Sequence, residues 1–98
     1  MTTKISQTEK RYSQYVGNLY YDMRWGRLIT VDNVKKNDYS NMYYVYYTIL
    51  DRPEQKSKNK PAIDFERDLK GGTILEVNDE EQYSSFKRHF NNGNRIVR

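Results

Sequence analysis

With 98 residues, the chain can form one small domain with a single modest hydrophobic core. It contains no Cys, which excludes disulfides, thiol catalysis and Cys-based zinc sites. The mean hydropathy of −1.08 and the 31% of charged residues approach the composition of disordered chains, but the 14% of aromatic residues predicts a folded protein. No apolar run is long enough to span a membrane and no signal-peptide pattern opens the chain, so we expect a soluble, cytoplasmic protein.

The net charge of +4 is concentrated at the C-terminal end of the chain. Residues 1–86 contain 13 Lys and Arg against 13 Asp and Glu, whereas the last twelve residues contain four basic residues and no acid. A basic tail of this kind favours an anionic partner such as nucleic acid. It is also a common way for a small protein to stay soluble, so the sequence leaves both explanations open.

The N-terminal part of the chain predicts a helix from about Gln7 to Met23. Ser6 and Glu9 have the spacing of a capping box, and apolar residues recur at helical spacing through the stretch. Gly17 interrupts this pattern at a cost of about 1 kcal/mol relative to Ala, so it marks either a close packing contact or a break. The apolar stripe consists of Tyr12, Tyr15, Val16, Leu19, Tyr20 and Met23.

Two strands should follow the Trp25-Gly26 pair that ends this helix. The alternation in Arg27–Lys36 predicts the first strand. The polar segment Lys35–Asn41 is rich in turn formers, so it should join this strand to Met42–Leu50 as an antiparallel hairpin. Trp25 sits at a boundary between elements, where it is either a core residue or an exposed stacking residue.

Met42–Leu50, with the sequence MYYVYYTIL, is the clearest strand candidate. Most of its residues are β-branched or aromatic, and none is charged, Gly or Pro. Because neither face is charged, we predict a central strand with at least one face in the core. The alternative is that one row of Tyr side chains is an exposed platform for bases or for a protein partner. Alternation places Tyr43, Val45, Tyr47 and Ile49 on one face, and Met42, Tyr44, Tyr46, Thr48 and Leu50 on the other.

The second half of the chain predicts a loop, two strands and a helix. Arg52–Pro61 contains two Pro and three Lys and is expected to be a mobile surface loop. Ala62–Asp68 alternates apolar with acidic residues, as a half-exposed strand does, and Thr73–Val77 is the expected last strand. Asn78 is the expected N-cap of a final helix with an acidic first turn and a basic last turn.

These elements predict an α+β domain, a single small antiparallel sheet of three or four strands with an N-terminal and a C-terminal helix. A small SH3-like barrel with helical additions is the alternative. Residues 1–98 should form one domain, with residues 1–5 and 94–98 as frayed tails. The element order resembles that of the double-stranded-RNA-binding domain. Residues 78–82 (NDEEQ) are acidic where that family has a Lys-rich helix start, so its function is not carried over and no family is assigned.

No motif in the sequence predicts catalysis. Asp64, Glu66 and Asp68 would share one strand face at about 6.5–7 Å between neighbours, where they could hold Mg²⁺, but a solvated acidic face explains the same pattern. His89, the only imidazole, lies at an expected helix end where the dipole favours a cation. The one Gly-Gly pair precedes a strand, unlike the nucleotide-binding motifs. We therefore expect no enzyme activity, no metal and no cofactor.

The sequence favours a non-enzymatic binding protein, with the size and composition common among phage or mobile-element accessory proteins. The leading expectation is nucleic-acid binding through the basic C-terminus and the Lys-rich loop. The alternative is an inhibitor or adaptor that binds a protein surface through Tyr side chains, and a metal-dependent nuclease is remote. An uncovered apolar strand face would favour a homodimer. The predicted nucleic-acid-binding residues are Lys56, Lys58, Lys60, Lys87, Arg88, Arg95 and Arg98; the predicted protein-binding residues are Trp25, Tyr39, Tyr43 and Tyr47.

Overall fold

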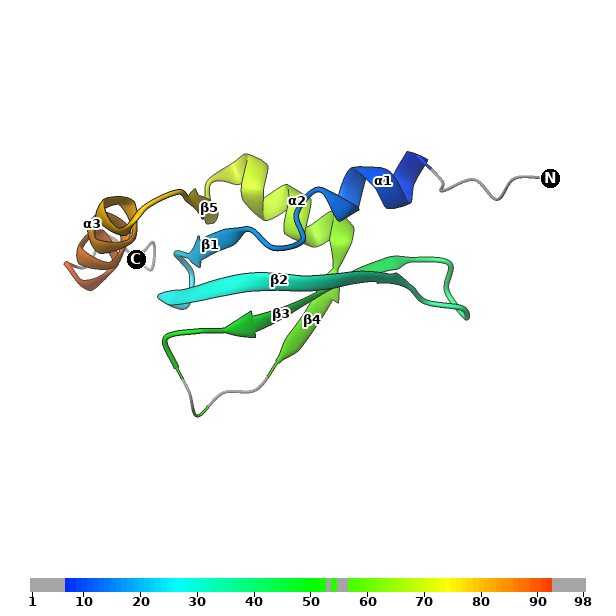
Figure 1. Cartoon of the computed structure of the whole chain (residues 1–98), viewed down its shortest axis with the longest axis horizontal. Coiled ribbons are helices and arrows are strands. Elements are labelled where there is room, and N and C mark those ends of the chain that lie inside the picture. The colour runs from blue at the N-terminus through cyan, green and yellow to red at the C-terminus, as the bar shows by residue number, and fades with distance from the viewer. Residues whose placement is uncertain (1–6, 53, 55–56, 93–98) are drawn as a thin grey trace.

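The structure is a computed structural model that describes residues 7–52, 54 and 57–92, and within these ranges it contains three helices and five strands (Figure 1). This arrangement confirms the predicted α+β class. The expected tails, residues 1–5 and 94–98, lie outside the described ranges. The helices are α1 (Gln7–Ser13), α2 (Ala62–Gly71) and α3 (Glu80–Asn91), and the strands are β1 (Leu19–Asp22), β2 (Arg27–Lys36), β3 (Tyr43–Ile49), β4 (Lys58–Pro61) and β5 (Ile74–Val77).

The five strands of the described chain form one antiparallel sheet in the order β4-β3-β2-β1-β5. Strands β4 and β5 are its two edges, so the sheet is open and the SH3-like barrel is not the architecture. The long β2 strand pairs with β1 over its first half and with β3 over most of its length. Because the central strands extend well beyond their neighbours, the molecule is elongated, with principal extents of 54 × 27 × 27 Å.

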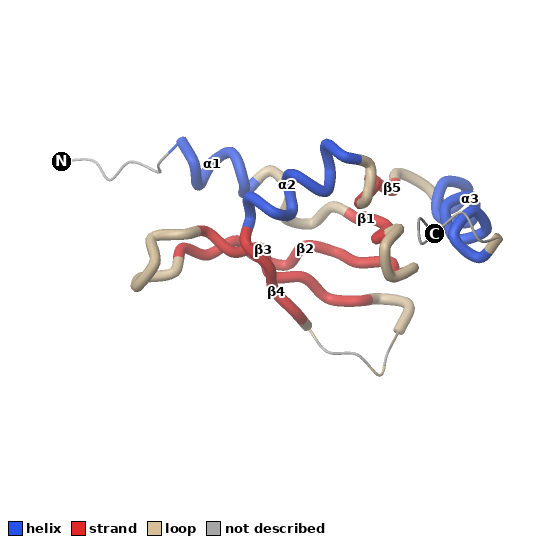
Figure 2. The backbone as a smooth tube through the Cα atoms, turned by 180° about the vertical axis from the view of Figure 1, so that it is seen from behind, coloured by secondary structure: helices blue, strands red, loops and turns tan. Residues whose placement is uncertain are grey.

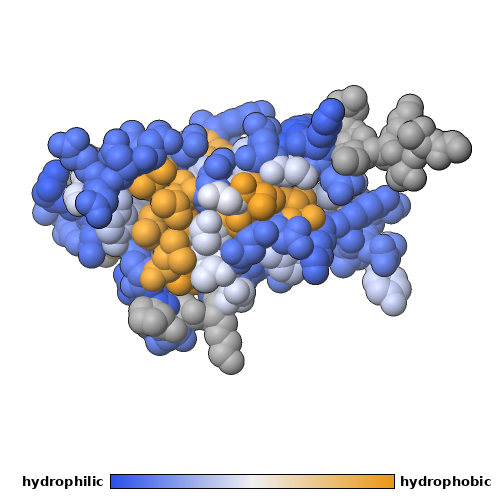
Figure 3. All heavy atoms as spheres, in the orientation of Figure 1, coloured by the Kyte–Doolittle hydropathy of each residue, from blue (hydrophilic) through white to orange (hydrophobic). Residues whose placement is uncertain are grey.

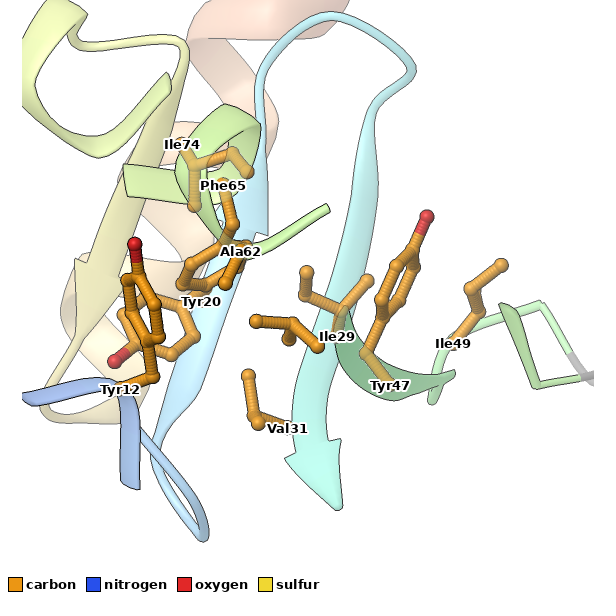
Figure 4. Packing of buried hydrophobic residues seen from close by; sticks show 10 residues of the cluster. Tyr12, Tyr20, Ile29, Val31, Tyr47, Ile49, Ala62, Phe65 and Ile74 are labelled. Carbon is orange, nitrogen blue, oxygen red and sulfur yellow. The ribbon is translucent and has the colours of Figure 1, made fainter. Parts of the chain in front are cut away.

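One face of the sheet is covered by α1 and α2 and carries the hydrophobic core. Tyr12 from α1 and Phe65 from α2 pack against apolar side chains from β1, β2, β3 and β5 (Figure 4). Aromatic rings contribute much of this packing, because Phe65 makes a tilted contact with the Tyr15 ring and an edge-to-face contact with the Tyr20 ring, at centroid distances of 5.4 and 5.2 Å. The remaining core residues are Ile29, Val31, Val45, Tyr47, Ile49, Ala62 and Ile74.

The opposite face of the sheet is covered only at one end. Helix α3 lies at that end of the molecule, well away from α1 and α2 (Figures 1 and 2). Its Tyr83 and Phe86 rings pack on Tyr21 of β1, at centroid distances of 5.9 and 6.4 Å. The rest of this face, formed by β2, β3 and β4, carries side chains that are partly or fully exposed. We call it the open face of the sheet.

The predicted helix from Gln7 to Met23 is wrong beyond Ser13, because its second half forms β1. Gly17 has a φ of +88°, which breaks the helix, and its N–H donates to the carbonyl of Val31 at 2.8 Å. The following residues pair with β2 on one side and β5 on the other. Tyr20 and Tyr21 are both buried, on opposite faces of the strand. Because both faces of β1 are covered, its apolar residues do not alternate with polar ones, and the sequence resembles a continuation of the helical stripe.

The predicted strand Ala62–Asp68 is also wrong, because this segment lies in α2. Ala62, Phe65 and Leu69 follow helical spacing toward the core, whereas Ile63, which the strand pattern placed inside, is 54% exposed. The helix ends at Gly72, whose φ of +81° gives a left-handed C-cap. A fifth strand, β4, lies in the segment predicted as a loop and pairs with β3.

The predicted hairpin of β2 and β3 is confirmed, and so is the alternation of β3. Val45, Tyr47 and Ile49 are buried against the helices, whereas Tyr44 and Tyr46 are partly exposed on the open face. A β-bulge between Val31 and Asn33 shifts the register of β2. Because this bulge adds one residue, apolar side chains stay on the core face on both sides of it.

Candidate nucleic-acid interface

Three segments that are far apart in sequence meet where α3 packs against the sheet. The Asp51 carboxylate accepts hydrogen bonds from the Leu28 backbone N–H at 2.9 Å and from the Tyr83 hydroxyl at 3.0 Å. The next residue, Arg52, donates through Nη2 to the Gly26 carbonyl at 3.1 Å. The turn between β1 and β2, the segment after β3 and helix α3 are therefore held together by direct contacts.

Local sequence features fix the orientation of α3. The Asp79 side chain caps its N-terminus by accepting from the Gln82 N–H at 2.8 Å. Burial raises the pKa of Tyr83, and its hydrogen bond to the Asp51 carboxylate acts in the same direction. Burial also raises the pKa of Tyr21 beneath the helix to about 12. Both phenols therefore stay neutral, and Tyr83 remains a hydrogen-bond donor to Asp51. The side of α3 that does not contact the sheet faces solvent.

The tight turn between β1 and β2 presents Trp25 to solvent. The buried Asp22 carboxylate accepts from the backbone N–H groups of Arg24 at 2.9 Å and Trp25 at 3.3 Å, and its other oxygen lies 3.4 Å from Arg27 Nη2. Gly26 completes the turn with a φ of +68°. These bonds fix the backbone of the turn, and 61% of Trp25 remains exposed on it. The sequence left this residue open between core and surface, and the structure places it on the surface.

Four cationic residues belong to this turn or to the segments that contact it, and together with Trp25 we call them the basic end: Arg24, Trp25, Arg52, Lys87 and Arg88. Lys87 and Arg88 project from α3 as exposed residues, and Lys87 Nζ lies 5.6 Å from the centroid of the Tyr83 ring. Among the carboxylates near this end, Asp22 and Asp51 are engaged by the turn and by Tyr83, and Asp68 of α2 lies 3.7 Å from Arg24. The positive charge of the basic end is therefore only partly offset locally.

A second group of aromatic and polar side chains lies on the open face, and we call it the tyrosine platform: Asn33, Lys35, Tyr44, Tyr46 and Asn59. Tyr46 is directly opposite Asn33 on β2 and Asn59 on β4, and Tyr44 is opposite Lys35. Lys35 Nζ lies 5.6 Å from the centroid of the Tyr46 ring. The platform thus combines two rings, two amides and a cation on one uncovered surface.

Between the basic end and the tyrosine platform the open face is apolar. Leu19 is 37% exposed and Leu50 is 46% exposed, and Leu28 and Leu75 are partly exposed beside them. Hydrophobic residues accordingly reach the surface in the middle of the molecule in Figure 3, over β1 and β2. We call these four residues the leucine patch.

The structure separates the residues that the sequence proposed for nucleic-acid binding. Lys87 and Arg88 lie in the basic end. Lys58 is exposed on the edge strand β4, but Lys60 is 3.1 Å from Asp68 Oδ2 and is only partly accessible. Lys56, Arg95 and Arg98 fall outside the described residues.

The residues proposed for protein binding are also divided. Tyr39 at the tip of the β2–β3 hairpin is 99% exposed, as expected. Tyr43 and Tyr47 lie on the face that the helices cover: Tyr47 is 5% exposed, and the Tyr43 ring packs on Tyr12 at 5.8 Å. The exposed Tyr row of β3 is instead the one formed by Tyr44 and Tyr46.

The acidic residues considered for a metal site point to different partners. Asp64 pairs with Arg67, Glu66 with Arg11, and Asp68 with Lys60. They lie on α2, not on one strand face. Among the described residues, no group of three or more His, Asp or Glu side chains is arranged to share a metal ion, and His89 is exposed on α3.

Glu66 is the most connected carboxylate of the core. It is 7% exposed and accepts from Arg11 Nε at 2.9 Å and from the Tyr15 hydroxyl at 2.8 Å, which fastens α1 and the following turn to α2. The hydrogen bond from Arg11 lowers the pKa of Glu66, burial opposes this effect, and Tyr15 contributes to the lowering. These contacts serve the fold, and they occupy the carboxylate.

Sequence reasoning did not select Arg52 or the Tyr44–Tyr46 pair as candidate binding residues. No local signal indicated Arg52, because its position depends on a bond to Gly26 in another part of the chain. The alternation of β3 did separate Tyr44 and Tyr46 from Tyr43 and Tyr47, but it could not show which row the helices would cover.

Comparisons with known proteins find no match for this chain among family models, curated proteins or solved structures. In the described part of the chain, no helix has the length and apolar character needed to cross a membrane.

Proposed function

We propose that this protein is a non-enzymatic nucleic-acid-binding protein whose basic end contacts the nucleic acid. The observation that carries the proposal is the 61% exposed Trp25 on a hydrogen-bonded turn that contacts Arg52 and α3. Exposed aromatic rings stack on bases, and neighbouring cations neutralise phosphates. The basic end supplies both kinds of group on one surface.

The arrangement of charge supports the same proposal. Lys87 and Arg88 come from α3, Arg24 from the turn and Arg52 from the segment after β3, so the cations come from three segments that meet at the turn. Arg24 lies 3.7 Å from Asp68 but its side chain is 55% exposed, which leaves it accessible to a phosphate. The proposal also accounts for the concentration of net positive charge after residue 86.

A protein partner is the second candidate, and the leucine patch favours it. Leu50 is 46% exposed beside other partly exposed leucines, and contiguous apolar surface of this kind is typical of interaction sites. In this case Leu50→Ser would abolish capture of the partner, whereas changes at the basic end would alter mainly the rate of association.

The test is fluorescence anisotropy with labelled random DNA and RNA oligomers at low salt. Trp25→Ala should weaken binding by about 5- to 150-fold, the range expected for the loss of one stacked base. Lys87→Ala with Arg88→Ala should weaken it further. The matched control is Lys10→Ala with Lys70→Ala, which removes two exposed cations from α1 and α2. No binding by the wild-type protein at low salt would overturn the proposal.

A further inference from the structure

We propose that the tyrosine platform is a second base-stacking subsite, and that the protein therefore prefers a single strand long enough to reach from Trp25 to Tyr46. This inference rests on the proposed function, and it adds the class of nucleic acid and the path of the strand. No helix of the described chain covers the platform, and its two rings lie on the same face of β3.

The geometry of the platform suits unpaired bases. Tyr44 and Tyr46 are two residues apart on one strand, so their attachment points are separated by about 6.5–7 Å. Two or three aromatic side chains displayed on a sheet surface can stack successive bases of a single strand, whereas a duplex conceals the faces of its bases. The flat, open surface thus selects for single strands.

Polar groups flank the rings in positions that suit the edges of bases. Asn33 and Asn59 lie on either side of Tyr46, one strand away in each direction. An amide side chain both donates and accepts, so Asn59 can pair with the donor–acceptor edge of a base. The Asn33 Oδ1 already accepts from the Val34 N–H at 2.8 Å, so Asn33 offers mainly its NH₂ donors. Lys35 beside the rings supplies a cation for a phosphate. The nearest carboxylate, Asp32, accepts a hydrogen bond from the Thr48 hydroxyl at 2.5 Å.

The open face connects this subsite to the basic end without a helix in between. The path follows β2 from Gly26 to Asn33 and passes the uncharged Leu28, Thr30, Thr48 and Leu50. The one carboxylate along this stretch of β2 is the exposed Asp32, which is bonded to the Thr48 hydroxyl. Seven residues of strand span about 23 Å. At the spacing of about 3.4 Å per stacked nucleotide, about seven nucleotides cover this distance. A shorter strand can occupy only one of the two subsites.

This geometry predicts a dependence on oligomer length. We compare fluorescein-labelled oligothymidylates of about 4 and about 12 nucleotides, within the range of site sizes of single-strand-binding domains. Tyr44→Thr with Tyr46→Thr should weaken binding of the longer oligomer by at least about tenfold and leave the shorter one within about twofold. Trp25→Ala should weaken binding of both. Tyr44→Phe with Tyr46→Phe should retain wild-type affinity, because the stacking rings remain.

Tyr39→Ala is the matched control, since Tyr39 is 99% exposed at the hairpin tip, beyond the strand residues that form the path. Thr retains the strand preference at both positions, and circular dichroism checks the fold. If the Thr variant does not fold, photocrosslinking of a 5-iodouracil oligomer to the wild-type protein tests the inference instead. Crosslinks at Tyr44 or Tyr46 are expected, and their absence would contradict the inference.

Three results would overturn the inference while leaving the proposed function intact. The first is that the Thr variant loses affinity for short and long oligomers equally, and the second is that it loses affinity for neither. The third is that a duplex competes as effectively as the single strand. If the wild-type protein binds no oligomer at all, the proposed function fails first. Loss of a protein partner in the Thr variant, with oligomer binding unchanged, would assign the platform to protein recognition instead.

Discussion

Phe90 of α3 lies directly against Gly26 in the β1–β2 turn. A Cβ atom built on Gly26 would be 2.6 Å from Phe90 Cδ2, well inside normal contact distance. Gly26 also has a φ of +68°, in the left-handed region that favours glycine. The turn that carries Trp25 and the helix that carries Lys87 and Arg88 therefore meet at a position where no side chain fits.

Gly26→Ala should lower the free energy of unfolding by about 1–3 kcal/mol, because it adds both backbone strain and a clash with Phe90. Thermal denaturation followed by circular dichroism measures the change. In a protein that already carries Phe90→Ala, the Gly26→Ala substitution should cost less than it does in the wild-type protein, because the ring that the new Cβ atom would meet is gone. Gly71→Ala is the control, since nothing lies within 4 Å of a Cβ at this helical position and Ala favours the helix.

Tyr47→Asp and Tyr44→Asp should differ sharply, although the two residues are three positions apart on the same strand. Tyr47 is 5% exposed in the core, so an Asp there buries an unpaired charge and removes a large side chain, at a cost of about 3–5 kcal/mol or more. Tyr44 is partly exposed on the open face, where Asp should cost about 1 kcal/mol. Urea denaturation of both variants checks this contrast, and equal losses would show that the covered face is misassigned.

Acid should weaken the attachment of α1 to α2 through Glu66. The pKa of Glu66 is lowered from 4.5 in the folded protein, so the folded state binds this proton less readily than the unfolded state. The stability from Glu66 is complete above about pH 4.5 and is lost as the pH falls through the lower folded pKa.

Glu66→Gln should therefore remove part of the fall in Tm between about pH 5 and pH 3, and should lower stability at pH 7 by about 1–2 kcal/mol. Glu76→Gln provides the comparison, because Glu76 is exposed on the edge strand β5. The linkage argument would be contradicted if the Glu66 variant kept the full wild-type dependence on acid.

Salt dependence should locate the phosphate contacts at the basic end. Each phosphate contact on a single strand contributes about −0.7 to the slope of log affinity against log salt concentration. Replacing Arg24, Arg52, Lys87 and Arg88 by Ala should reduce the magnitude of that slope by about two to three. Anisotropy titrations at several salt concentrations measure it, and the Lys10 and Lys70 variant shows the effect of losing two exposed cations elsewhere. An unchanged slope would show that these cations do not contact phosphates.

The sequence by itself determined the class of the fold and the β2–β3 hairpin, because alternation and turn residues act over a few neighbouring positions. It also determined that Tyr44 and Tyr46 share one face of β3, which follows from the geometry of a strand alone. The final helix was also predictable from local sequence, because acidic residues fill its first turn and basic residues its last turn.

The tertiary structure decided the features that depend on long-range pairing. Residues 19–22 continue a helical pattern in the sequence, but hydrogen bonding to β2 and β5 makes them a strand. Ala62–Asp68 alternates like a strand, but its packing on β3 and β5 favours a helix whose apolar side faces the core. Only the position of α1 and α2 decided which Tyr row of β3 is buried. The turn that carries Trp25 likewise meets Arg52 and α3 only in the folded chain, because contacts between distant segments, unlike local periodicity, depend on the whole fold.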